Sequence, residues 1–197
     1  MRFSHFFFLL LFFGLLSTSC KTLMSYTNIL NCDFRMESLT DTKLAGIGVQ
    51  NIKNFSDLNL LQVGNLSAAY LSGNVPIEFR LNLEGKNPNP AEAAMAKFDW
   101  ILLIDDIQMA TGTNEQEYKI PPNDGTQIIP LSISINLLDI LTNETKSSLL
   151  NFGFNLAGAG NKPTRVGLKI KPTIYLNSIP ISYPGYLDLG TEFGGKE

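Results

Sequence analysis

Histidine is almost missing from this 197-residue chain, since the single one, His5, lies in the first few residues. Imidazole is the commonest general base and the commonest metal ligand near neutral pH, so the rest of the chain lacks both. Ser-His-Asp and Cys-His catalysis are excluded there, as are zinc sites built on histidine. We therefore expect no catalytic residue, no metal site and no cofactor.

The chain also lacks a large excess of charge of either sign. The chain carries 15 basic and 18 acidic residues, a net charge of −3, and the lysines and arginines are scattered rather than clustered. A protein that binds nucleic acid needs a basic patch to neutralise phosphates. The sequence therefore predicts no nucleic-acid partner.

One long apolar run stands near the start of the chain. Residues 6–16 (FFFLLLFFGLL) follow a basic Arg2 and precede the small residues of 17–19. This order is typical of a secretory signal peptide. As a helix the run would reach only about 16 Å, roughly half of a hydrocarbon core of about 30 Å, so a permanent membrane span is not expected. We predict that residues 1–19 are a signal peptide.

Cysteine occurs twice, at positions 20 and 32. Cys20 directly follows the small residues, at the place where a bacterial lipoprotein carries the thiol that receives its lipid, and we predict lipidation there. Ser17 and Ser19 also satisfy the rule of ordinary signal cleavage, which leaves open a disulfide between Cys20 and Cys32. If Cys20 is lipidated, we expect Cys32 to be a small buried hydrophobe rather than a nucleophile, since no basic residue adjoins it.

The residues after Cys20 bear on location. They begin with Lys21, and no acidic residue appears before Asp33. The acidic run that sends some lipoproteins to the cell surface is absent, and so is the aspartate associated with retention in the inner membrane. We expect a lipid-anchored protein of the outer membrane that faces the periplasm. Its tether is predicted over 20–39, followed by a single domain over 40–193.

Alternating apolar residues predict strands along that domain. The clearest strand covers 75–84, where Phe79 and its apolar neighbours face one side and Glu78 and its polar neighbours the other. Residues 98–104 are apolar at nearly every position, which favours a strand covered on both faces. Helices are predicted over 58–72 and 137–157, with one helical turn over 91–96. Seven or so strands separated by turn signals indicate an antiparallel β-sandwich.

Two short motifs could suggest chemistry. A paired acid and base is one interpretation of Asp105 and Asp106, but adjacent strand residues face opposite ways, which favours a turn. Residues 158–162 (GAGNK) lack the spacing of a phosphate-binding loop and are interpreted as a connection.

A set of motifs in the middle of the chain resembles the late-embryogenesis-abundant (LEA) type 2, or WHy, family. In chain order they are the NPNP of 87–90, a strand ending in Ile104-Asp105, Ile120-Pro121, Gly125, and Ile129-Pro130-Leu131. With the signal peptide, the whole chain is similar to the bacterial lipoproteins that carry this domain. The resemblance implies an immunoglobulin/fibronectin-III-like sandwich, no enzymatic activity and an association with water stress.

The chain departs from that family in three places. Asp106 stands where the family often has glycine, and the segments 137–157 and 177–193 are additions.

Asn87 and Asn89 are expected to cap backbone groups in a tight crossing rather than to contact a ligand.

Two functions of different classes follow. The first is a non-catalytic structural or binding module held at a membrane by its lipid. The alternative is a carrier of an apolar ligand such as a lipid, with a cleft lined by residues 98–104 and 137–150.

Overall fold

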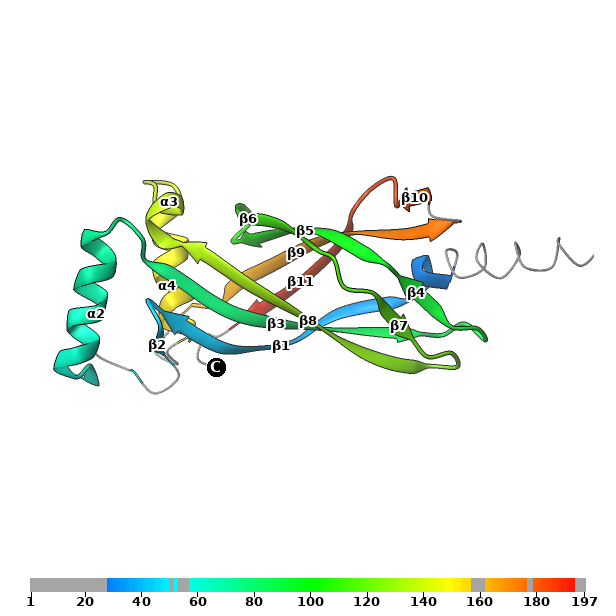
Figure 1. Cartoon of the computed structure of the whole chain (residues 1–197), viewed down its shortest axis with the longest axis horizontal. Coiled ribbons are helices and arrows are strands. Elements are labelled where there is room, and N and C mark those ends of the chain that lie inside the picture. Colours follow the sequence, from blue (N-terminus) through cyan, green and yellow to red (C-terminus); the bar gives the residue numbers. More distant parts are fainter. Residues whose placement is uncertain (1–27, 50–51, 53–56, 157–161, 177–178, 194–197) are drawn as a thin grey trace, which may run out of the picture.

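The computed structural model describes residues 28–49, 52, 57–156, 162–176 and 179–193. They form an antiparallel β-sandwich with short helices (Figure 1). One sheet has the order β2-β1-β3-β8, from strands Ile47–Gly48, Asp33–Leu44, Pro76–Asn87 and Gly125–Asn136. The other has the order β10-β9-β5-β6, from Ile179–Ser182, Thr164–Leu176, Lys97–Ile104 and Ile107–Asn114, with β11 (Leu187–Phe193) also paired to β9. A small third sheet pairs β4 (Ala93–Met95) with β7 (Tyr118–Ile120).

The two large sheets bury their inner faces against each other, in the strand arrangement of a fibronectin-III-like sandwich. On β3, the residues Phe79, Leu81 and Leu83 are buried, as their alternation predicts. Their partners on β8 are Ile133, Leu131 and Ile129, all of them buried. β8 is also an edge strand, which explains how it accommodates Pro130 without losing a hydrogen bond to a further strand.

Strand β5 differs from its prediction of two covered faces. Phe98, Trp100, Leu102 and Ile104 are buried, whereas Ile101 and Leu103 on the opposite face are only half-buried. An unbroken apolar run predicts a strand, but it does not tell which of its faces will be covered.

Residues 93–95 form strand β4, so the helical turn predicted over 91–96 is wrong. Ala93 and Met95 are buried, and they pair with Ile120 and Tyr118 of β7. Alanine favours helix in isolation. Here the burial of alternate side chains and the pairing with β7 override that preference.

The domain begins earlier than predicted. Asn28–Leu30 form a helical turn whose Ile29 is fully buried in the core, and β1 starts at Asp33. β1 contains register shifts between Met36 and Ser38 and between Thr40 and Lys43. These shifts interrupt the alternation of inward and outward side chains by which the strand could have been detected. The tether predicted over 20–39 is therefore too long, and its first residues, 20–27, lie outside the described residues.

The two segments predicted to be helical, 58–72 and 137–157, contain three helices. Helix α2 (Leu60–Leu71) begins with a capping box between Asn59 and Gln62, yet no residue in it is buried. Short α3 (Leu137–Ile140) is followed by α4 (Lys146–Leu156), which buries Leu149 and Phe152 in the core. Figure 1 shows all three at the same end of the sandwich.

Asp105 and Asp106 form a two-residue hairpin turn between β5 and β6, as predicted. Both have positive φ angles, of 50° and 67°, as a type I′ turn requires. Asp105 Oδ1 accepts a hydrogen bond of 3.0 Å from the Arg165 backbone, and Asp106 pairs with the Arg165 guanidinium at 2.8 Å. These contacts explain how aspartate serves where the LEA type 2 family often has glycine.

The alternation of β3 generates a stability prediction. Phe79 is 4% exposed and its ring meets that of Phe152 edge-on at 6.0 Å between centroids. Phe79→Ala should therefore lower the free energy of unfolding by about 3–5 kcal/mol. Glu78→Ala, on the opposite face, should change it by less than about 0.5 kcal/mol. Denaturant melts check both, and equal losses would show that the register of β3 is wrong.

Candidate functional site

Of the two cysteines, only Cys32 lies in the described part of the chain. It is free and buried, and its Sγ donates to the Asn28 carbonyl at 3.2 Å. Burial, with a smaller contribution from the charge of Asp33, raises the pKa of the Cys32 thiol to about 11. The reactive thiolate is therefore scarce at neutral pH. Cys32 is a small buried hydrophobe, as expected. The predicted lipidation site, Cys20, and the loop residues 158–161 lie outside the described residues.

The side chain of Asn87 is fully buried and makes four hydrogen bonds. Its Nδ2 donates to the carbonyls of Ala91 and Ile120 at 2.9 and 3.1 Å. Its Oδ1 accepts from the backbone N–H and the side-chain amide of Asn89, at 3.0 and 2.7 Å. One side chain thus joins the end of β3 to the chain before β4 and to the end of β7.

Asn89 extends this network to the N-terminal turn. Its Nδ2 donates to the Asn28 carbonyl at 3.0 Å, and Asn28 Nδ2 donates to the carbonyls of Ala91 and Glu92, at 3.4 Å each. On the other side, the N–H groups of Asn123 and Asp124 donate to the carbonyls of Asn89 and Asn87, at 2.8 Å each. We call Asn28, Asn87 and Asn89 the asparagine junction. As expected, Asn87 and Asn89 cap backbone groups.

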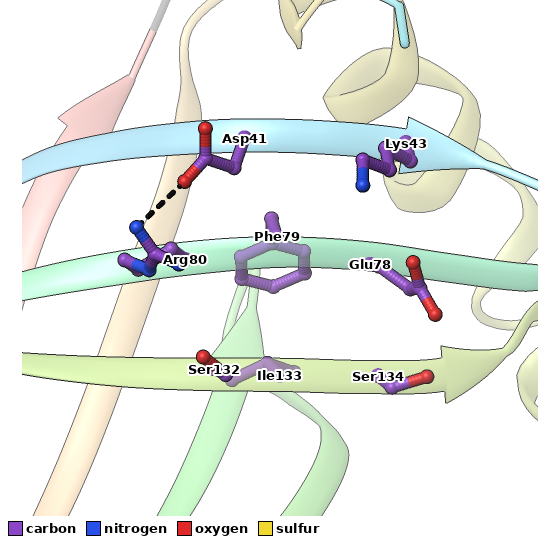
Figure 2. Close-up of a pocket in the computed structure, with 8 residues that line it drawn as sticks. All are labelled: Asp41, Lys43, Glu78, Phe79, Arg80, Ser132, Ile133 and Ser134. Atoms are coloured by element: carbon purple, nitrogen blue, oxygen red, sulfur yellow. Dashed lines mark ion pairs between the residues drawn. The ribbon is translucent and has the colours of Figure 1, made fainter. Parts of the chain in front are cut away.

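A shallow hollow of about 240 Å³ opens on the outward face of the first sheet (Figure 2). It lies at the bulge of β1, where Asp41 has a φ of 55°. Its lining residues are Asp41, Lys43, Glu78, Phe79, Arg80, Ser132, Ile133 and Ser134. Asp41 and Arg80 pair at 2.8 Å, but their side chains are 57% and 49% exposed.

The chemistry available in this hollow is limited. Its charged side chains are two acidic and two basic residues, and the Asp41–Arg80 pair is open to water, which weakens such pairs. Phe79 and Ile133 are buried and belong to the core beneath it. The arrangement offers hydrogen bonds to a small polar molecule, but no desolvated acid or base that could move a proton.

A second hollow, of about 350 Å³, lies where β1 faces β11. Its lining residues are Met36, Glu37, Ser38, Leu39, Leu81, Val166, Thr191 and Glu192. The volume is at the small end of the range for ligand pockets. Neither hollow is lined by residues 98–104 or 137–150, the segments expected to form an apolar cleft. Alternate residues of β5, together with Leu149 and Phe152, are buried in the core instead.

The described residues hold no group of three or more His, Cys, Asp or Glu side chains placed to bind a metal ion. Within the same ranges, every buried side-chain nitrogen and oxygen has a hydrogen-bond partner. No helix in this part of the chain combines the length and hydrophobicity needed to cross a membrane.

Comparison with known proteins identifies no matching family model and no matching curated protein. Solved structures do match. A crystal structure of a protein from Archaeoglobus fulgidus has 14% identity and a TM-score of 0.35, covering 81% of this chain and 99% of that one. The solution structure of a candidate late embryogenesis abundant protein has 11% identity and a TM-score of 0.39, covering 92% and 82%. Likenesses at these scores say nothing about activity.

The asparagine junction can be tested by substitution. Asn87→Ala should lower the free energy of unfolding by at least about 2 kcal/mol, because it leaves the buried partners of the amide unsatisfied. Asn82→Ala is the matched control on the same strand, since Asn82 is half-buried on the outward face and donates to Ser38 at 3.0 Å. It should cost about 1 kcal/mol or less. Similar losses for both variants in urea melts would contradict a special role for the junction.

Proposed function

We propose that this protein is a non-catalytic lipoprotein, held at a membrane by lipid on Cys20, with an LEA type 2-like sandwich that acts as a structural or binding module. The observation that carries the proposal is the position of Cys20. It directly follows an apolar run and three small residues, and it stands eight positions before Asn28, where the described fold begins. Such a spacing places a lipid next to the domain.

The proposed location is the outer membrane, with the sandwich in the periplasm. It rests on the residues after Cys20, which contain neither an early acidic run nor an aspartate at the next position. Because the fold includes residues 28–39, the tether from Cys20 covers at most 20–27. The domain is thus held closer to the membrane than a tether of 20 residues would hold it.

A non-catalytic role is supported by the residues that could carry chemistry. The Asp41–Arg80 pair is exposed, and the Cys32 thiol has a raised pKa. The asparagine junction uses its polar atoms on backbone groups. The link to water stress rests on the resemblance of the 87–131 motifs to the LEA type 2 family, and it belongs to this proposal.

One observation favours the second candidate, a carrier of an apolar ligand. The hollow between β1 and β11 includes Met36, Leu39, Leu81 and Val166, so an apolar group could occupy it. Glu37 and Glu192 also line it, so a ligand with an amine or hydroxyl end would suit the site better than a plain hydrocarbon.

Substitution of the anchor tests the leading proposal. Two or more acyl chains on Cys20, at about 0.8 kcal/mol per buried CH₂, would hold the chain on a membrane. Cys20→Ser should move the protein from the membrane pellet to the soluble fraction and abolish incorporation of labelled palmitate. Cys32→Ser is the control, and it should leave the protein in the pellet. Recovery of unacylated Cys20→Ser protein in the pellet would contradict anchoring by lipid.

A further inference from the structure

The paired end of β9 and β10 exposes large apolar side chains. Tyr175 is 48% exposed, Ile179 is 64% exposed and Tyr186, directly before β11, is 42% exposed. We call these three residues the apolar tip. Clusters of exposed apolar residues in a soluble domain mark sites of contact with another surface.

The apolar tip has no acidic residue around it in the sequence. From Lys171 to Tyr186 the chain contains one charged residue, Lys171 itself. Its Nζ lies 5.9 Å from the centroid of the Tyr186 ring, close enough for a cation–π contact. On the neighbouring strand β5, Asp99 pairs in register with Lys171, so the base of the apolar tip carries charges of both signs and the stretch beyond it is uncharged in sequence.

The tip extends beyond the neighbouring strand. β5 begins at Lys97, which pairs with Thr173, so Tyr175 lies past the last residue of β9 that β5 can cover. There β9 is paired with β10 alone, with Tyr175 opposite Pro180 and Ile181 opposite Ile174. Tyr175 and Ile179 point to opposite faces of this two-stranded end, because Ile179 pairs with residue 176.

The tip and the N-terminal turn lie at the same end of the sandwich. Asn28 is bonded to the chain just before β4, through the carbonyls of Ala91 and Glu92. Directly after β4, the Ala96 N–H donates to the Thr173 carbonyl at 2.9 Å, at the base of the tip. Figure 1 shows β10, β4 and the N-terminal turn together, with α2 at the other end.

We propose that the apolar tip lies in the interfacial layer of the membrane that holds the lipid of Cys20. This inference rests on the proposed anchoring. Eight residue steps separate Cys20 from Asn28, and a fully extended chain of that length reaches about 28 Å at most. The end that carries the tip must therefore stay near the lipid headgroups.

The residue types of the tip suit that layer. Tyrosine is enriched where hydrocarbon meets water, because its ring is apolar and its hydroxyl can reach water or a headgroup. Ile179, on the opposite face of the same two-stranded end, adds further exposed apolar area. Lys171 lies at the base of the tip opposite Asp99 of β5, so the contact is expected to depend on the apolar and aromatic side chains rather than on net charge.

Helix α2 provides the contrast. Its Leu60, Leu61, Tyr70 and Leu71 are 67–88% exposed, more than the residues of the tip. However, α2 and the asparagine junction lie at opposite ends of β3. Helix α2 precedes the first residue of β3, whereas Asn87 of the junction is its last residue. The 12 residues of β3 span about 36 Å, more than the tether can reach. Exposure alone would favour α2 for membrane contact, whereas the position of the anchor favours the tip.

The proposal is tested by measuring how deeply a labelled residue lies in the membrane. Binding of the whole protein to vesicles would not test it, because the acyl chains alone keep the protein bound and would mask a weaker contact. The full lipidated chain is placed in phosphatidylethanolamine–phosphatidylglycerol vesicles containing nitroxide-labelled lipid. One variant carries a fluorophore at Ile179→Cys and the matched control carries it at Leu71→Cys on α2. Cys32 is buried, so labelling is directed to the introduced thiol.

We expect quenching at position 179 to be at least about twofold stronger than at position 71, as contact of the tip with the interface requires. Adding Tyr175→Glu to the Ile179→Cys variant should weaken that quenching, whereas adding Leu60→Glu should not. Circular dichroism checks that each variant is folded.

The other outcomes each contradict a defined part of the argument. Equal quenching at both positions, or stronger quenching at 71, would overturn the assignment of the tip. A chain that floats with the vesicles but is quenched at neither position would overturn the contact and leave the anchor standing. A chain that does not float would overturn the anchor, and the membrane contact of the tip with it.

Discussion

The buried amide of Asn87 organises one end of this protein. A buried polar group must find partners within the protein, and this one satisfies the carbonyls of two separate segments while accepting from Asn89. The N-terminal turn is then held by Asn89 and by the backbone before β4. The position of the N-terminal turn, where the chain enters the sandwich, is therefore set by hydrogen bonds as well as by apolar packing.

The two ends of the sandwich have different structures. The end opposite the junction is closed by α4, whose Leu149 and Phe152 complete the core, while α2 stands apart with its apolar side chains in water. The junction end carries tight turns, the small β4–β7 sheet and the exposed tip of β9 and β10. A module tied to a membrane beside Asn28 presents its helices away from that membrane. In the proposed arrangement, the exposed face of α2 therefore lies away from the membrane.

The polar groups of the domain mostly maintain its architecture. Asp105 and Asp106 close a hairpin on Arg165, the asparagine junction binds backbone carbonyls, and Cys32 is kept as a thiol by burial. Catalysis needs groups whose pKa values are set for proton transfer in a desolvated site. The two hollows offer exposed charges instead. These features support the proposed role as a structural or binding module.

Local signals in the sequence determined several elements correctly. The alternation in β3, the helical spacing of α2 and the turn at Asp105-Asp106 depend on neighbours within a few positions, so they can be recognised without a fold. The predicted lipidation site also rests on a linear pattern, around Cys20, and it stays a prediction. These features stem from side-chain periodicity and turn chemistry, both of which act over short distances along the chain.

Tertiary structure alone decided the rest. Bulges in β1 removed the period of two, so that 28–39 resembled a tether although Ile29 is buried. Pairing with β7 made a strand of the alanine-rich residues 93–95, against their helical preference. The proximity of Asn28 to the end of β9 depends on hydrogen bonds between residues more than 60 positions apart. Such contacts form only when the sheets have assembled, because their free energy depends on burial and partners that no short stretch of sequence contains.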